Sequence, residues 1–358
     1  MGLFKKFQNK EQYKYNNNIF IIDGTILKKF KNNSSMSEVT IPDFVTEIGD
    51  QAFMGCSNLV KVICSNGIKK IGMAAFGNCP NLKSIILPDT IEVIGDGAFA
   101  FCKNLNTISI PKNLKNINLG VFGECRSLTS VNITEGVEAI GNNAFYNCNN
   151  LLSANIPDSV FKIGMMAFGG CSKLKKITVP DSVLTIDKGA FSECRDLETI
   201  FLPKNLLELS DSLFYNCRNL KIIKMPENVT MIGSGAFTSC ESLTEISIPN
   251  KVKEIGKTAF YNCIKLAKIS LSEALVKIRE GAFLSCKSLE EIVIPSSVEL
   301  IEFGAFGECE SLKSLKILSN RILLADLSDN KNFIIYGNQN SIVEKFANQY
   351  NLSFKAIN

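Results

Sequence analysis

The nine residues Gly189-Ala190-Phe191-Ser192-Glu193-Cys194-Arg195-Asp196-Leu197 carry a pattern, Gly-Ala-Phe-x-x-Cys-x-x-Leu, that recurs every 23 residues in this chain of 358. Each phenylalanine of the pattern is followed by a cysteine three residues later and by a leucine six residues later. The phenylalanines are Phe53, Phe76, Phe99, Phe122, Phe145, Phe168, Phe191, Phe214, Phe237, Phe260, Phe283 and Phe306. A fixed period between about 20 and 50 residues is typical of solenoids. The sequence therefore predicts about twelve stacked turns rather than two or three compact domains.

One turn can be followed from Leu174 to Cys194. Apolar and polar residues alternate up to Pro180, which predicts a short strand with Ile177 and Val179 facing the core. Proline has no N–H, so the strand is expected to end there. A second apolar pair then returns to the core from the opposite side, and a glycine usually follows it. We expect these glycines to allow a bend that a Cβ would resist; they include Gly95, Gly141, Gly164, Gly233 and Gly256.

The full pattern, Leu-x-x-Ile-x-Ile-Pro-x-x-Val-x-x-Ile-Gly-x-x-Ala-Phe-x-x-Cys, resembles the BspA-type (Treponema pallidum-type) leucine-rich repeat over roughly three-quarters of the chain. The resemblance implies a leucine-rich repeat solenoid with parallel strands, used for adhesion and protein–protein contact. Such proteins occur on the surfaces of host-associated bacteria and in parasitic protists. The C-terminal Ile335-Tyr336-Gly337, together with Phe346-Ala347 and Phe354-x-x-Ile357, resembles a segment that often closes these arrays.

Breaks in the period divide the chain into four parts. Residues 1–18 form a polar, Asn- and Lys-rich tail, and residues 19–41 form a degenerate N-terminal cap repeat in which Asn33 takes the cysteine position. Residues 42–318 are the leucine-rich repeat solenoid. Residues 319–358 leave the period and are predicted to form a strand, a short helix and a last strand, a small αβ C-terminal cap. Solenoid ends need atypical segments because their terminal apolar faces have no neighbouring turn.

The composition argues against most chemistry. The chain contains no His, which removes the commonest general base and the commonest metal ligand. Paired carboxylates such as Glu290-Glu291 fall at variable outward positions, where solvated surface is the expected role. The net charge of +4 comes from interspersed acidic and basic residues, without the basic stripe of a nucleic-acid binder. We therefore expect no enzyme activity, no cofactor, no metal and no nucleic-acid partner.

The compartment is suggested by what the sequence lacks. Residues 1–18 contain no apolar run long enough for a signal peptide, and no stretch elsewhere could span a membrane. As written, the chain is expected to be cytoplasmic. A chain that has been trimmed, or that is exported by an unconventional route, would instead be at the cell surface or secreted.

Thirteen cysteines are the other conspicuous feature of the composition. A metal or redox array would need paired motifs, but C-x-x-C is absent and the repeat cysteines occur once per turn. A single line of thiols cannot surround a zinc ion tetrahedrally, and parallel Cβ vectors do not give disulfide geometry between neighbouring turns. The repeat cysteines, and Cys64 at an inward strand position, are therefore predicted to be free and buried in the core.

Most outward positions are small and polar, but five apolar residues break this pattern in repeats six to eight. Phe161, Leu184 and Leu207 occupy one equivalent position in three consecutive turns, and Phe201 and Ile222 face outward from the strands of adjacent turns. Equivalent positions stack about 4.8 Å apart, so the first three residues are expected to form a contiguous apolar strip. We predict that the five residues contact a partner; ordinary exposed surface is the alternative.

These observations favour a non-catalytic interaction module, adhesin-like or a scaffold, that presents a rigid surface to another protein. The identity of the partner stays open: a surface or host protein is one option, and self-association is another. The alternative function is a purely structural or spacer role at the cell envelope.

Overall fold

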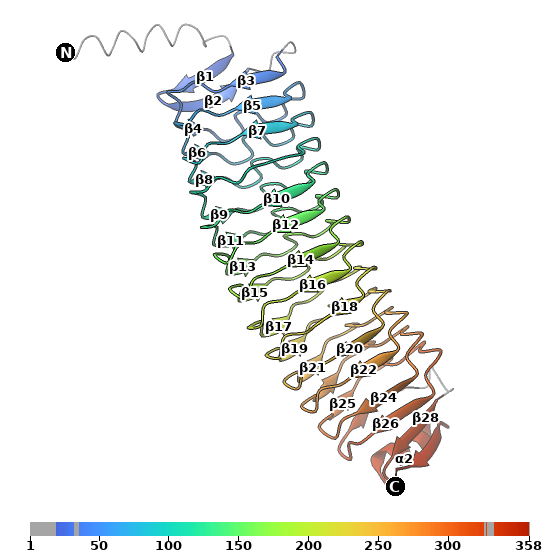
Figure 1. Cartoon of the computed structure of the whole chain (residues 1–358). Helices are drawn as coiled ribbons and strands as arrows, with labels where there is room; N and C mark the ends of the chain where they lie inside the picture. The colour runs from blue at the N-terminus through green and yellow to red at the C-terminus, as the bar shows by residue number, and fades with distance from the viewer. Residues whose placement is uncertain (1–18, 32–35, 326, 328–332, 358) are drawn as a thin grey trace, which may run out of the picture. The chain divides into compact units, whose positions relative to one another are not determined.

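The computed structural model describes residues 19–31, 36–325, 327 and 333–357, and the chain divides into two compact units, residues 1–159 and 160–358. The predicted tail and Asn33 lie outside the described residues. Each unit is a parallel β-solenoid with a 23-residue turn, which confirms the predicted fold class (Figure 1). A turn contributes a first strand, usually of three residues, and then a second strand of two residues. We call the two rows of strands the first-strand face and the second-strand face.

In the N-terminal unit the second-strand face begins with a hairpin. β1 (Phe20–Asp23) pairs antiparallel with β2 (Ile26–Phe30), and a parallel ladder continues from β2. The hairpin therefore covers the edge that the first parallel strand would otherwise leave open. The second strands that follow are β4 (Glu47–Ile48), β6 (Lys70–Ile71), β8 (Val93–Ile94), β9 (Asn116–Ile117) and β11 (Ala139–Ile140). The first strands are β3 (Glu38–Thr40), β5 (Lys61–Ile63), β7 (Ser84–Ile86), β10 (Ser130–Asn132) and β12 (Ser153–Asn155).

The C-terminal unit repeats the same plan over more turns. Its first strands are β14 (Lys176–Thr178), β16 (Thr199–Phe201), β18 (Ile222–Ile223), β20 (Glu245–Ser247), β22 (Lys268–Ser270), β24 (Glu291–Ile294), β26 (Ser314–Ile317) and β28 (Ile334–Gly337). Its second strands are β13 (Lys162–Ile163), β15 (Thr185–Ile186), β17 (Glu208–Leu209), β19 (Met231–Ile232), β21 (Glu254–Ile255), β23 (Lys277–Ile278), β25 (Leu300–Ile301) and β27 (Leu323–Leu324). The six strands from β17 to β27 form one continuous parallel sheet.

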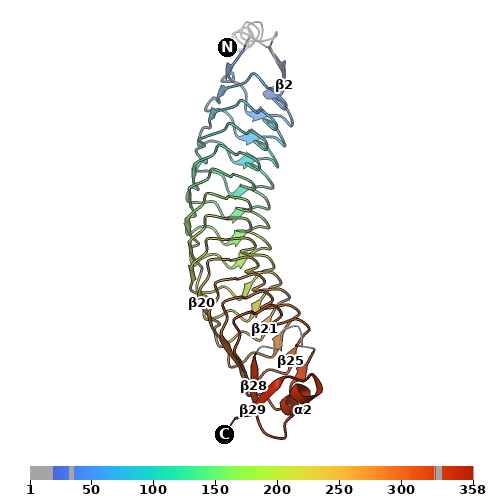
Figure 2. The same ribbon diagram turned by 90° about the vertical axis from the view of Figure 1, so that its right-hand side faces the viewer.

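The C-terminal unit ends in the predicted small αβ cap. Helix α2 (Ile342–Gln349) begins at the N-cap Ser341, whose hydroxyl accepts a hydrogen bond from the Glu344 N–H at 3.3 Å. The last strand, β29 (Ser353–Ala356), pairs parallel with β28. Figure 2 shows α2 beside β28 and β29, and Val343 and Phe346 are buried. The amphipathic helix therefore covers the end of the unit's core.

The core of each unit contains a ladder of stacked phenylalanine rings, each at most 2% exposed from Phe53 to Phe306. Neighbouring ring centroids lie 4.8 to 5.5 Å apart in the N-terminal unit and 5.1 to 6.2 Å apart in the C-terminal unit. The longest step joins Phe191 and Phe214, at 6.2 Å. Leu213 occupies the position that alanine holds in most turns, and its bulkier side chain is expected to distort the turn locally. The structure shows a wider step without a break in the period.

The recurring glycine serves a close approach rather than a bend, so the physical reason given from the sequence was wrong. A Cβ on Gly95 would lie 2.6 Å from the Met73 nitrogen, and one on Gly256 would lie 2.6 Å from the Ser234 nitrogen. Neither glycine has a positive φ. The backbone of the preceding turn therefore excludes a Cβ. Where Asn118 replaces this glycine, its side-chain amide instead donates to the preceding turn's Ile94 carbonyl at 2.7 Å.

Left-handed backbone occurs at two positions in every repeat turn, a feature that the sequence analysis missed. The residues two before and two after each repeat phenylalanine all have φ between 48° and 74°. Glycine or asparagine fills many of these positions, as the left-handed region favours. Phe101 (φ 62°) and the β-branched Thr258 (φ 50°) do not suit it, so they carry backbone strain.

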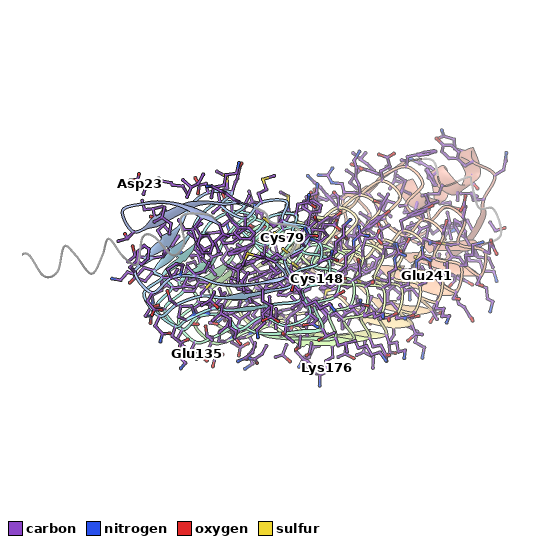
Figure 3. The ribbon with its side chains drawn as sticks, turned by 90° about the horizontal axis from the view of Figure 1, so that it is seen from above. Asp23, Cys79, Glu135, Cys148, Lys176 and Glu241 are labelled. Atoms are coloured by element: carbon purple, nitrogen blue, oxygen red, sulfur yellow. The ribbon has the colours of Figure 1, made fainter. Side chains whose placement is uncertain are left out.

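The thirteen cysteines are free and buried, as predicted. Cys79 and Cys148 lie inside the coil of the N-terminal unit, whereas Glu135 lies on its outside (Figure 3). The structure adds a hydrogen bond to the hydrophobic role: Cys79 Sγ donates to the Phe53 carbonyl at 3.0 Å, and the same contact to the preceding turn recurs along both units. A thiol can donate this weak hydrogen bond, whereas the methyl group of an alanine cannot, which is a reason for cysteine at the position.

Candidate functional site

All five predicted site residues belong to the C-terminal unit, where they lie on two different surfaces. Phe161, Leu184 and Leu207 directly precede β13, β15 and β17 on the second-strand face, and we call them the apolar row. Phe201 ends β16 and Ile222 begins β18 on the first-strand face. The exposed fractions are 47%, 58% and 62% along the row, 50% for Phe201 and 70% for Ile222. The structure brings together the three row residues and, separately, the other two.

The apolar row is backed by a buried residue in each turn. Val160 and Val183, which precede Phe161 and Leu184, are fully buried and hold the chain against the core. The Leu184 N–H donates to the Phe161 carbonyl at 2.9 Å, so these two row residues lie on directly hydrogen-bonded turns.

The step from Leu184 to Leu207 is less regular than predicted. β13 pairs with β15, but within the described residues of this unit no ladder pair joins β15 to β17. The turns remain in contact on either side of the step. The Lys204 N–H donates to Asp181 Oδ1 at 2.9 Å, and the Ser210 hydroxyl donates to the carbonyl of the last residue of β15. The row therefore continues over neighbouring turns, and the widest phenylalanine step lies in the core of the same two turns.

Phe201 and Ile222 line a groove of about 460 Å³ on the first-strand face. Ile222 lies opposite Thr199 in the β16–β18 register, so Phe201 and Ile222 are diagonal neighbours. The groove is lined by Thr199, Ile200, Phe201, Leu202, Lys204, Ile222, Lys224, Met225, Pro226, Glu227 and Asn228. Its wall is therefore mainly apolar, with charged groups at a few points.

The strand ladder is interrupted beside this groove. β14, β16 and β18 form one sheet and β20 and β22 another. On the C-terminal side of the interruption the Ala267 N–H donates to the Thr244 carbonyl at 2.9 Å, but across the part of the chain that the structure describes no matching bond joins Thr244 to Lys221. A second groove, of about 880 Å³, lies across β18, β20 and β22. Unpaired backbone groups and apolar walls thus share one stretch of this face.

Sequence reasoning found the exposed side chains of this stretch but missed the interruption. The repeat around Ile222 keeps its period and its inward apolar residues, so nothing in the pattern indicates that β18 and β20 do not pair.

One lysine contacts the Phe201 ring, and two others line the groove. Lys176 Nζ lies 5.2 Å from the ring centroid, within the range of a cation–π contact. Lys204 is paired with Asp181 at 2.7 Å, and this hydrogen bond raises the pKa of Lys204 and lowers that of Asp181. Lys224 has no ion pair to any residue that the structure describes. Lys176 and Lys224 are thus cations without a carboxylate partner beside an exposed aromatic ring.

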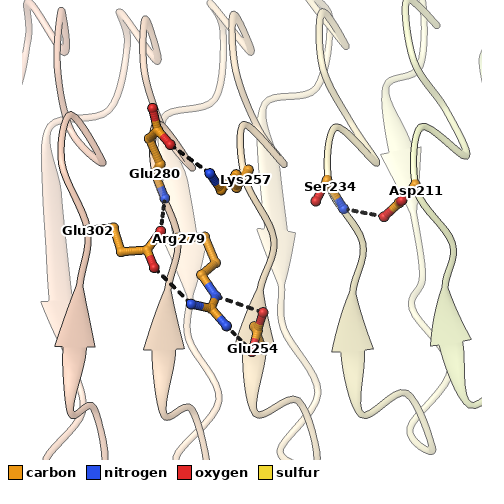
Figure 4. A network of polar contacts seen from close by, with 7 residues as sticks. All are labelled: Asp211, Ser234, Glu254, Lys257, Arg279, Glu280 and Glu302. Atoms are coloured by element: carbon orange, nitrogen blue, oxygen red, sulfur yellow. Dashed lines mark hydrogen bonds and ion pairs between the residues drawn. The ribbon is translucent and has the colours of Figure 1, made fainter.

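A cluster of charged side chains elsewhere in the unit is structural (Figure 4). Arg279 takes the close-approach glycine position, and its guanidinium donates to Glu254 and Glu302, both at 2.8 Å. The hydrogen bond from Arg279 lowers the pKa of Glu302. Glu302 also accepts the Glu280 N–H at 2.9 Å, and Glu280 pairs with Lys257 at 2.9 Å. A general acid needs a raised pKa, whereas the pKa of Glu302 is lowered. The three carboxylates are ion-pair partners that join neighbouring turns.

No group of three or more Cys, Asp or Glu side chains among the described residues is placed to hold a metal ion. Over the same residues, no helix combines the length and the apolar character that a membrane crossing requires.

The period, the inward leucines and the parallel first strands define the class: this is a leucine-rich repeat protein. More specifically, the chain belongs to the family described as "BspA type Leucine rich repeat region (6 copies)", which matches residues 26–152, 138–245 and 208–330. The resemblance noted in the sequence is therefore confirmed. Among curated proteins, none matches this chain.

Solved structures with this architecture come from several bacteria. A leucine-rich repeat protein from Bacteroides ovatus is 28% identical, with 95% of this chain and 100% of that chain covered and a TM-score of 0.74. A leucine rich cell surface protein from Faecalibacterium prausnitzii is 29% identical, with coverage of 95% and 93% and a TM-score of 0.59. The pneumococcal vaccine antigen PcpA, 18% identical with coverage of 94% and 96% and a TM-score of 0.52, shares the fold alone.

Proposed function

We propose that this protein is a non-catalytic interaction module that binds another protein on the first-strand face, at the groove around Phe201 and Ile222. The observation that carries the proposal is that three features coincide at β16 and β18. Two apolar side chains are at least half exposed, they line a groove, and the strand ladder is interrupted beside it. Each feature alone is ordinary surface. Together they supply apolar anchors, a place to bury them and backbone groups able to hydrogen-bond.

The chemistry of the groove favours an extended segment that brings an apolar side chain together with carboxylates. Burial of Ile222 and Phe201 would contribute on the order of 1 to 2 kcal/mol each, since both are only partly exposed at the start. Lys176 and Lys224 would pair with acidic groups on either side of the apolar contact. Glu227, the one carboxylate among the groove-lining residues, would set the orientation by repelling acidic groups at its end.

A non-catalytic role is supported by the state of the polar groups. The chain has no His, and burial raises the pKa of the Cys194 thiol to about 12, far from a nucleophile's range. The carboxylates of the Arg279 cluster are held in ion pairs. Binding, rather than catalysis, is what such a surface can do.

We infer that the module acts at the cell surface rather than in the cytoplasm. The support is the similarity to the Faecalibacterium prausnitzii protein, which is described as a cell surface protein. Protease treatment of intact cells that express an epitope-tagged chain tests the inference. Loss of the tag signal without lysis would support surface display, whereas protection until lysis would favour the cytoplasm.

The binding proposal is tested by comparing matched surface substitutions. The double variant Ile222→Ser with Phe201→Ser should no longer capture the protein that the wild type captures. Its far-UV circular dichroism should be unchanged, because both side chains point outward. Val293→Ser is the control, since Val293 is a 48%-exposed outward residue on β24 in the same unit. Equal capture by all three proteins would reject the groove and leave the structural or spacer role as the better account.

A further inference from the structure

The apolar row has an adjacent row of exposed side chains at the next position of each turn. Lys162, Thr185 and Glu208 are the first residues of β13, β15 and β17, and all three are exposed. Each follows a row residue directly, so the charged positions run alongside the apolar row. The positive charge stands at the N-terminal end of the row and the negative charge at its C-terminal end.

We propose that the apolar row is a homodimer surface on which two copies of this chain pack face to face with their rows antiparallel. The two-fold axis would cross the row at Leu184. Phe161 of one copy then meets Leu207 of the other, and Leu184 meets itself. A surface used by both copies in a two-fold contact must be complementary to itself, and a row of three apolar residues centred on Leu184 meets this condition.

The charges select the antiparallel arrangement. Rotation about the axis brings Lys162 of each copy opposite Glu208 of the other, which gives two opposite-charge contacts at the ends of the apolar row. Parallel rows would instead lose both contacts, because the charged positions would then lie on opposite sides of the interface. Charge complementarity at an interface fixes the register more than it sets the affinity.

Both charged side chains are exposed and can reach a second copy. Lys162 has an intramolecular partner, Asp187, at 3.4 Å, but both side chains are substantially exposed and such surface pairs contribute little. Glu208 has no ion-pair partner within the described residues. The contact rests on three anchors per copy, so the dimer is expected to be weak and concentration-dependent.

This inference does not depend on the groove, which lies on the other strand face. Ile222→Ser should therefore leave self-association unchanged, and Leu184→Ser should leave capture of a partner at the groove unchanged. The two proposals can fail separately.

Sedimentation velocity of the full chain from micromolar to near-millimolar concentration tests the dimer. The wild type should show a concentration-dependent shift toward a dimer, and Leu184→Ser should abolish it. Lys162→Glu or Glu208→Lys alone should weaken self-association by about tenfold or more, because each creates two like-charge contacts. The double variant should recover association, since it restores both contacts with the signs exchanged.

The control is Glu245→Lys, which reverses an exposed charge on the first-strand face of the same unit. Thermal unfolding of every variant shows whether the fold is retained. A wild type that stays monomeric across the range would overturn the proposal. So would a double variant no better than the single ones, or a Glu245→Lys variant weakened as much as Glu208→Lys.

Discussion

Replacing Phe260 with Ala tests the ring ladder where it is most tightly stacked within the C-terminal unit. The Phe260 side chain is fully buried, and its centroid lies 5.1 Å from that of Phe237 and 5.3 Å from that of Phe283. Truncation removes a buried ring from contact with both neighbours and leaves a cavity that the hydrogen-bonded turns cannot close. The free energy of unfolding should fall by about 4 kcal/mol, within the range for buried aromatic residues.

Two comparisons make this value informative. Phe260→Leu keeps most of the volume and loses the stacking, so it should cost only about 1.5 kcal/mol. Phe306→Ala should cost less than Phe260→Ala, because Phe306 has one ring neighbour in the ladder, Phe283 at 5.5 Å. Urea unfolding followed by circular dichroism measures the losses, and amide exchange shows whether opening spreads through adjacent turns. Equal losses at Phe260 and Phe306 would contradict nearest-neighbour stacking and indicate one cooperative domain.

Three further outcomes are expected. Native protein should react with a thiol reagent at few or none of its cysteines, because burial raises the pKa of Cys194 to about 12 and little thiolate forms below that pH; rapid labelling before denaturant is added would contradict the packing. Thr258→Gly should stabilise the protein by about 1 kcal/mol, since it relieves a β-branched residue at φ 50°; a lower melting temperature would show that its side-chain contacts outweigh the strain. The folded-state pKa of Glu302 is lowered by Arg279, so the stability that their pair contributes is present above the ordinary carboxyl pKa and is lost as pH falls through the folded value. Arg279→Gln should therefore make stability less sensitive to acid. Identical acid unfolding curves for the wild type and the variant would show that the pair contributes no pH-dependent stability.

The repeated core of the fold could be predicted from the sequence because the turn is short and its spacing unbroken. Phe191, Cys194 and Leu197 recur with identical spacing, and identical spacing places side chains in identical environments in a stacked structure. The same logic correctly predicted free, buried cysteines. It also located Ile222, since this outward apolar residue stands out against eleven polar equivalents.

The features that could not be predicted depend on contacts between turns, and a sequence pattern within one turn carries no information about them. The close approach of Gly95 to Met73, the thiol hydrogen bond from Cys79 to Phe53 and the missing ladder between β18 and β20 all involve the neighbouring turn. The left-handed residues were missed for another reason. Glycine and asparagine fill many of these positions, but residues as different as Met166, Glu193 and Thr258 fill others, which obscures the signal.

Site-specific photo-cross-linking tests the claim that the first-strand groove binds a partner most directly. A photoreactive residue is placed at Ile222 in one protein and at Val293, an outward position on the same face, in another. In cells that express each protein, the account predicts a discrete adduct with another protein from position 222 and none from position 293. Adducts of equal yield from both positions, or from neither, would contradict it.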